Sequence, residues 1–132
     1  MPLRWFGKKT VPLAGVPTVR RQKTYSAQSG YVYQYFYEGH RPSSPERGTE
    51  YVFDVSSDRK TSSPVSVVIS DAAVANWQNE SGRTLNATEQ YAIAKMALFQ
   101  AFDERESPEA MRQAVHVSPG AVQAILAALH ID

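Results

Sequence analysis

The spacing of apolar side chains changes once along this chain, close to Ser70. Before that point, residues 30–38, 50–56 and 65–70 alternate their side chains between two faces, which is the period of a β-strand. After it, apolar side chains recur about every 3.6 residues, the period of an amphipathic helix. The loops between these segments, residues 39–48 and 56–64, have lengths that favour antiparallel pairing of successive strands. We therefore predict an α+β fold in which a three-stranded antiparallel meander precedes a helical layer.

Capping signals divide the second half of the chain into about four helices, and only helices are expected after residue 71. Ser70 is an N-cap residue for the first of them. Asn86 and Glu89 form a capping-box pattern at the start of the longest helix. Two Ser-Pro pairs, Ser107-Pro108 and Ser118-Pro119, each supply an N-cap and a proline at the first helical position. The predicted helices cover residues 71–79, 87–105, 108–115 and 119–130.

The longest predicted helix carries two apolar stripes, so it needs two covers. Leu98 and Phe102 belong to the stripe expected to face the sheet, and both are predicted to be buried. Ile93 and Met96 lie on the opposite side, where the C-terminal helix 119–130 is expected to cover them. This arrangement places the long helix at the centre of the core.

Length and composition indicate one globular domain. The chain has 132 residues, the size of a single domain, and we predict an extended arm over 1–24 followed by one α+β domain over 25–132. It has no cysteine, which removes disulfides and thiolate metal sites. No segment resembles a signal peptide or approaches the roughly 18 apolar residues of a membrane span. We expect a soluble cytoplasmic protein with no membrane partner, no metal and no cofactor.

The charge is distributed unevenly, although the chain as a whole carries only +1. Residues 1–41 hold seven Lys and Arg against one acid, a net charge of +6. Residues 42–132 hold seven Lys and Arg against twelve acids, a net charge of −5. This asymmetry directs attention to the basic N-terminal arm.

The basic arm has two interpretations. It could contact the phosphates of a nucleic acid, or it could dock on protein, either its own domain or a second copy of the chain. Within the domain, Asp103, Glu104 and Glu106 offer carboxylates that oppose the dipole of the long helix. Docking on protein is favoured because the rest of the chain is acidic, and because Trp5 and Phe6 add apolar anchors that a purely electrostatic tail does not need.

The tyrosines of the first predicted strand also have two interpretations. Tyr31, Tyr33, Tyr35 and Tyr37 share one face, which could form a platform for a partner. Tyrosine is equally a favoured strand residue that packs its ring into an aromatic layer. We favour the packing interpretation.

No catalytic residue can be nominated from motifs, because the three histidines are isolated and neither a phosphate loop nor a nucleophile elbow is present. We therefore predict a non-catalytic protein-interaction or assembly domain, with a homo-oligomer as the expected assembly. The first alternative is a nucleic-acid-binding protein that uses the basic arm and the tyrosine strand, and the second is a small enzyme without a recognisable motif. The candidate partner-binding residues are Trp5, Phe6, Arg20, Arg21, Lys23, Tyr31, Tyr33, Tyr35 and Tyr37.

Overall fold

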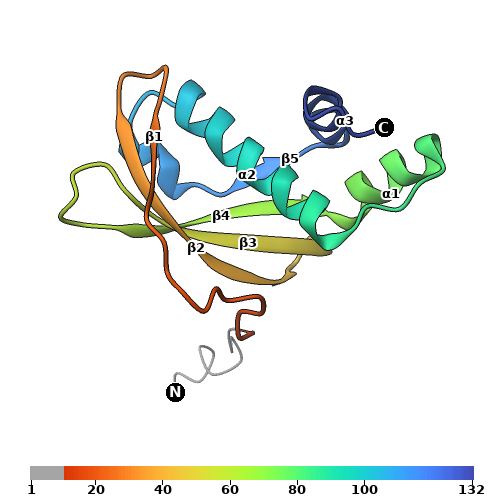
Figure 1. Cartoon of the computed structure of the whole chain (residues 1–132), viewed down its shortest axis with the longest axis horizontal. Coiled ribbons are helices and arrows are strands. Elements are labelled where there is room, and N and C mark those ends of the chain that lie inside the picture. Colours follow the sequence, from red (N-terminus) through yellow and green to blue (C-terminus); the bar gives the residue numbers. More distant parts are fainter. Residues whose placement is uncertain (1–10) are drawn as a thin grey trace.

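The computed structural model describes residues 11–132, in which one five-stranded sheet is covered on one face by helices (Figure 1). The strands lie in sequence order, and the first four are antiparallel neighbours. The fifth strand runs parallel to the fourth. The strands are Lys23–Ser26 (β1), Val32–Ser43 (β2), Gly48–Ser56 (β3), Ser63–Ser70 (β4) and Val115–Val117 (β5).

The helices form the second layer. They are Asp71–Ser81 (α1), Ala87–Glu104 (α2) and Pro119–Ala128 (α3), with a 3-10 helix at Pro108–Arg112 (η2). Figure 1 shows α2 crossing one face of the sheet, while α1 and α3 lie together at one end, in contact with each other. We call the face under α2 the inner face and the opposite one the outer face. Along β2, Tyr33, Tyr35 and Tyr37 belong to the inner face, whereas Gln34 and Phe36 belong to the outer face.

The core lies between the inner face and α2, as predicted. Leu98 and Phe102 are both fully buried, and the Phe102 ring stacks on the Tyr33 ring with 4.2 Å between their centroids. Ile93, on the second stripe of α2, is also fully buried. The C-terminal helix α3 packs against α2 and contributes Val122, Ile125 and Leu126 to the core. The long helix therefore occupies the central position expected from its two apolar stripes.

The N-cap residues predicted from the sequence do begin helices α1 and α2. The Ser70 hydroxyl accepts a hydrogen bond from the Ala73 amide at the start of α1. Asn86 and Glu89 form a complete capping box at the start of α2, each accepting from the backbone amide of the other. Within residues 11–132, no helix combines the length and the hydropathy needed to cross a membrane.

Two strands were not predicted, and the expectation that only helices follow residue 71 was wrong. The segment 108–115, expected to be helical, forms η2 and then enters β5, where Val115 and Val117 are buried and His116 is exposed. The Arg105 guanidinium donates to the carbonyls of residues 110, 113 and 114, which holds the chain in this turn. β1, at the end of the predicted arm, has only four residues and no apolar alternation.

Candidate functional site

The described part of the N-terminal arm, residues 11–24, pairs its backbone with the edge of β2 at two separate places. Near its start, Ala14 and His40 exchange backbone hydrogen bonds of 2.7 and 2.9 Å. Near its end, β1 pairs antiparallel with β2, from Lys23 opposite Tyr35 onward. Between these attachments the arm runs beside β2 with no backbone pairing to it among the described residues. The arm therefore forms an arch along the sheet edge.

Arg20 holds this arch from the outer face. The Arg20 guanidinium donates to Glu38 Oε1 at 3.0 Å and to Asp54 Oδ2 at 2.9 Å, and it lies 3.7 Å from the centroid of the Phe36 ring. The two carboxylates, through these hydrogen bonds first, raise the pKa of Arg20. Exposed ion pairs are individually weak, but here three contacts converge on one planar group.

Within residues 11–132, the acids at the end of α2 form no ion pair with a basic residue of the arm. Asp103 instead accepts a 2.8 Å hydrogen bond from the Tyr25 hydroxyl and another of 2.8 Å from the Gln28 amide. It thereby fastens β1 and the β1–β2 turn to the helix. Arg20 docks on carboxylates of the sheet because the arm runs along the opposite end of β2 from Asp103.

Two glycines allow the arm to approach the sheet. Gly39 has a φ of +132°, and a Cβ at this position would lie 2.7 Å from the Ala14 carbonyl oxygen. Gly15 has a φ of +63°, and a Cβ there would lie 2.8 Å from His40 Cε1. Both positions combine a backbone conformation that favours glycine with a contact too close for any side chain. The close approach of the arm to β2 therefore depends on a glycine in each of the two segments.

A cleft opens on the inner side of this arch. It consists of two adjoining hollows of about 560 and 370 Å³, which share Tyr37 and Tyr91. Its walls come from the arm, β2, β3 and the first half of α2. The lining residues are Gly15, Pro17, Thr18, Val19, Arg21, Lys23, Tyr35, Tyr37, His40, Thr49, Tyr51, Ala87, Thr88, Gln90, Tyr91 and Lys95. We call this the inner cleft.

Tyrosines form the floor of the inner cleft. The Tyr37 and Tyr91 rings pack at a centroid distance of 4.7 Å, and the Tyr37 hydroxyl is 3.2 Å from His40 Nδ1. Burial, with a smaller contribution from neighbouring tyrosines, raises the pKa of both Tyr35 and Tyr37 to about 12. Burial also raises the pKa of Tyr51 and of Tyr91. These phenols are therefore neutral at physiological pH and can donate hydrogen bonds.

Positive charge borders this aromatic floor in the smaller of the two hollows. Arg21 and Lys23 project from the arm and β1, and Lys95 projects from α2. No Asp or Glu is among the residues of 11–132 that line the cleft. Low-dielectric walls lined by one sign of charge concentrate the field, so the inner cleft attracts anionic groups.

The inner cleft is suited to binding rather than to a recognisable catalytic step. His40 is its one histidine, and the lining residues described here supply no carboxylate to orient that ring and no activated nucleophile beside it. Within residues 11–132, no group of three or more His, Asp and Glu could hold a metal ion. What the cleft offers is cations, neutral phenols and ring surface.

Four of the predicted partner-binding residues meet in this cleft: Arg21, Lys23, Tyr35 and Tyr37. Arg20 instead lies on the outer face. Tyr33 is 1% exposed and stacks on Phe102, so it cannot serve an exposed platform. Tyr31 is exposed beside Tyr33, away from the cleft. The predicted contacts of Trp5 and Phe6 lie outside the described residues.

Sequence reasoning missed His40, Tyr51, Tyr91 and Lys95 as members of the site. His40 reaches the inner face because the register of β2 shifts between Tyr37 and Gly39, so the inner positions change from odd to even numbers. A glycine directly after an alternating strand was the available signal for such a bulge. Tyr91 and Lys95 come from a helix more than fifty residues away, which no local pattern connects to β2.

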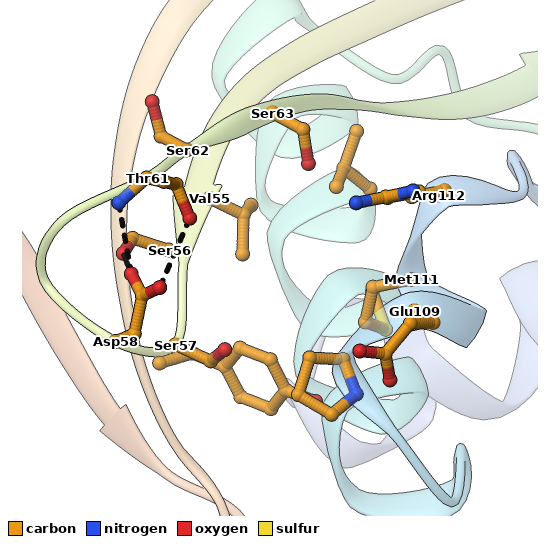
Figure 2. Close-up of a pocket in the computed structure, with 13 residues that line it drawn as sticks. Val55, Ser56, Ser57, Asp58, Thr61, Ser62, Ser63, Glu109, Met111 and Arg112 are labelled. Atoms are coloured by element: carbon orange, nitrogen blue, oxygen red, sulfur yellow. Dashed lines mark hydrogen bonds between the residues drawn. The ribbon is translucent and has the colours of Figure 1, made fainter.

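A smaller polar pocket of about 180 Å³ lies between the β3–β4 loop and η2 (Figure 2). Its most prominent carboxylate, Asp58, accepts from the Thr61 amide at 2.9 Å, from the Lys60 amide at 2.8 Å and from hydroxyls of the same loop. These hydrogen bonds hold the pKa of Asp58 far below its usual range. Glu109 and Arg112 of η2 line the opposite wall. Asp58 thus serves the loop, and the larger inner cleft is the better candidate site.

Comparison of the chain with protein-family models, with curated proteins and with solved structures found no match. The chemistry of the inner cleft and of the surfaces around it is what indicates a function.

Proposed function

We propose that this chain is a non-catalytic protein-interaction domain, and that its inner cleft binds an acidic segment of a partner polypeptide that also carries an apolar side chain. The observation that supports this proposal is the composition of the cleft. Arg21, Lys23 and Lys95 border the aromatic floor in the smaller hollow, and no carboxylate lines either hollow within the described residues.

Each part of the ligand has a matching part of the cleft. The three cations pair with carboxylates and accelerate the encounter with an acidic partner. The neutral hydroxyl groups of Tyr37 and Tyr91 can donate to carboxylate or carbonyl oxygens. Both rings are half-buried, and the part of each that stays exposed can contact an apolar side chain without a free face for stacking. Both hollows fall within the roughly 300–1,000 Å³ typical of ligand pockets.

A single-stranded nucleic acid fits the same charges less well. Binding of bases without sequence preference relies on aromatic faces open for stacking. In the inner cleft, the Tyr37 ring packs against both Tyr91 and Phe53, and Tyr51 is only 5% exposed. We therefore place a polypeptide before a nucleic acid as the partner.

A second copy of this chain is one source of such a polypeptide. Residues 42–132 carry a net charge of −5, which complements the basic cleft and arm. Sedimentation velocity over a range of protein concentrations would detect this self-association. A homo-oligomer that forms through the cleft should dissociate in the Lys95→Glu variant.

The direct test is fluorescence anisotropy with a labelled short peptide of Glu, Asp, Leu and Phe. Its controls are the same peptide with Gln and Asn in place of the acids, and a labelled oligothymidylate. We expect Lys95→Glu to weaken binding of the acidic peptide roughly 3- to 10-fold. The matched variant Arg47→Glu makes the same charge change at an exposed position outside the cleft and should leave affinity unchanged.

The outcomes separate the alternatives. Equal affinity for the acidic and the neutral peptide would reject the role of charge in the cleft. Binding of the oligothymidylate alone, with the same loss in Lys95→Glu, would replace the protein partner with a nucleic acid. Equal losses in Lys95→Glu and Arg47→Glu would show that the overall charge of the protein, and not the cleft, attracts the peptide.

A further inference from the structure

The outer face of the sheet has a hollow of its own, separate from the inner cleft. It measures about 420 Å³ and lies between the arm, β2, β3 and the β3–β4 loop. It faces away from the cleft because its β2 residues, Gln34 and Phe36, alternate with Tyr35 and Tyr37 along the strand. The residues that line it are Arg20, Gln22, Gln34, Phe36, Asp54, Ser56, Arg59, Lys60, Thr61 and Ser62. We call this the outer pocket.

A buried amide in the outer pocket lacks a hydrogen-bond partner. Gln34 is only 4% exposed, and it is the one buried polar residue among residues 11–132. Its side-chain oxygen is fully covered and accepts no hydrogen bond from any described residue. Leaving a buried acceptor unsatisfied is unfavourable, so a ligand that displaces the side chains covering this oxygen and offers a donor would gain the hydrogen bond that the fold leaves open.

The pocket also carries cations that the fold does not use. Arg20 and Asp54 neutralise each other at 2.9 Å, and Ser62 donates to the same carboxylate at 3.0 Å. Within residues 11–132, the side chains of Arg59 and Lys60 form no ion pair and no hydrogen bond. Together with Glu38, which also pairs with Arg20, the pocket residues carry three positive and two negative charges, a net charge of +1.

The two unused cations stand on a well-ordered loop. The Lys60 amide donates to Asp58 Oδ1 at 2.8 Å, and the Arg59 amide donates to Ser56 Oγ at 3.0 Å. The Thr61 amide and hydroxyl bind the same Asp58 carboxylate. The backbone that carries Arg59 and Lys60 is thus already held in place, which lowers the entropic cost of closing their side chains on an anion.

We propose that the outer pocket is a second binding site, for a small phosphorylated molecule that also carries a hydroxyl or amino group. Arg59 and Lys60 bind the phosphate, since charge-assisted hydrogen bonds to phosphate are among the strongest that proteins form. Gln34 accepts from the hydroxyl or amino group deeper in the pocket. This site uses different residues from the inner cleft and stands independently of the partner proposed for it.

The test is a ¹⁵N-HSQC titration with ribose 5-phosphate as the probe, beside inorganic phosphate and ribose alone. Ribose 5-phosphate is expected to shift amides of the β3–β4 loop and of Gln34. Inorganic phosphate should shift the loop only, with lower affinity, and ribose alone should shift neither. The double variant Arg59→Ala/Lys60→Ala changes two exposed side chains and should weaken both phosphates about tenfold or more. Arg47→Ala, on the β2–β3 hairpin, is the matched control and should bind like the unmodified protein.

Gln34→Leu separates the contribution of Gln34, which binds the hydroxyl or amino group, from that of Arg59 and Lys60, which bind the phosphate. It should reduce the affinity for ribose 5-phosphate to that for inorganic phosphate, while the affinity for inorganic phosphate stays the same. The proposal is overturned if the double variant binds ribose 5-phosphate as tightly as the unmodified protein. It is also overturned if the shifts spread equally over basic residues elsewhere, such as Lys95 and Arg47, because that pattern indicates unspecific attraction of an anion.

Discussion

The two faces of strand β2 make opposite use of neighbouring residues. On the inner face, Tyr33 and Tyr35 are buried against α2, and their burial raises the pKa of both phenols. On the outer face, Gln34 is equally buried but its amide oxygen has no partner, and Phe36 is covered by a guanidinium. The inner face uses its side chains for packing and ends in a cleft, and the Tyr33 hydroxyl is buried there without a hydrogen-bond partner. The outer face leaves the Gln34 oxygen without a partner beside a charged hollow. Residues one position apart on β2 therefore face two different environments, the core and the inner cleft on one side and a polar hollow on the other.

The largest expected difference between the faces is in packing. Phe53, fully buried on the inner face of β3, contacts Tyr35 and Tyr37. Phe53→Ala should lower the free energy of unfolding by about 3–5 kcal/mol, through lost burial and a cavity. Phe36→Ala removes the same ring from the half-exposed outer face and should cost less than about 1.5 kcal/mol. Urea unfolding of both variants measures the two values, and equal losses would contradict the assignment of core and surface.

An intermediate effect is expected where the arm meets the strand edge. Gly39→Ala places a Cβ 2.7 Å from the Ala14 carbonyl at a φ of +132°, so the arm must detach or the strand must shift. We expect a loss of about 1–3 kcal/mol in unfolding free energy, together with faster amide exchange at Ala14 and His40. Gly30→Ala is the matched control, because Gly30 also has a positive φ but no atom lies within 4 Å of a Cβ there.

Comparing the two glycine variants separates the steric clash with Ala14 from the backbone strain, because both positions have a positive φ but only Gly39 has atoms close to an added Cβ. Exchange at Ala14 that is no faster in Gly39→Ala than in Gly30→Ala would reject the docking of the arm. Deleting residues 1–22 should also lower thermal stability, because it removes the Ala14 bridge and the Arg20 contacts. If the shortened chain melts like the full chain, the arm does not stabilise the domain.

The smallest expected effect on the free energy of unfolding near neutral pH comes from the ionisation of Tyr35 and Tyr37. At alkaline pH the same ionisation has a clear effect. Burial raises the pKa of Tyr35 and Tyr37 from 10.0 to about 12, so folding favours their neutral form. This stabilisation is complete below pH 10 and is lost as the pH rises from about 10 to 12. Urea unfolding should therefore show no tyrosine-dependent change between about pH 7 and 9 and a falling stability above about pH 10. The double variant Tyr35→Phe/Tyr37→Phe should show a shallower fall, and an unchanged alkaline slope would contradict the burial of these hydroxyls.

Local patterns predicted the long elements of this fold because those elements repeat their signal over many residues. The alternation over 30–38 identified most of β2, and the Asn86–Glu89 capping box marked the start of α2. β1 and β5 were missed because four and three residues are too few to establish a period. β5 forms because Val115 and Val117 find a free edge of β4, a partner more than forty residues earlier.

The inner cleft was predictable only in part, for the same physical reason. Arg21, Lys23, Tyr35 and Tyr37 were proposed from charge and alternation, and they do meet in one cleft. Which of two interpretations applied to each tyrosine depended on where α2 lies, and Tyr33 went to the core while Tyr37 reached the cleft.

What the sequence by itself determined is the set of features that a residue and its near neighbours decide together: the change of period near Ser70, the helix caps, the apolar stripes of α2 and the basic arm. What only the tertiary structure decided is which distant groups face each other. Arg20 meets Glu38 and Asp54 rather than the acids of α2, and the bulge after Tyr37 turns His40 inward. Capping and periodicity act over a few residues of chain, whereas strand register, sheet edges and ion pairs depend on contacts that form only when the whole chain has folded.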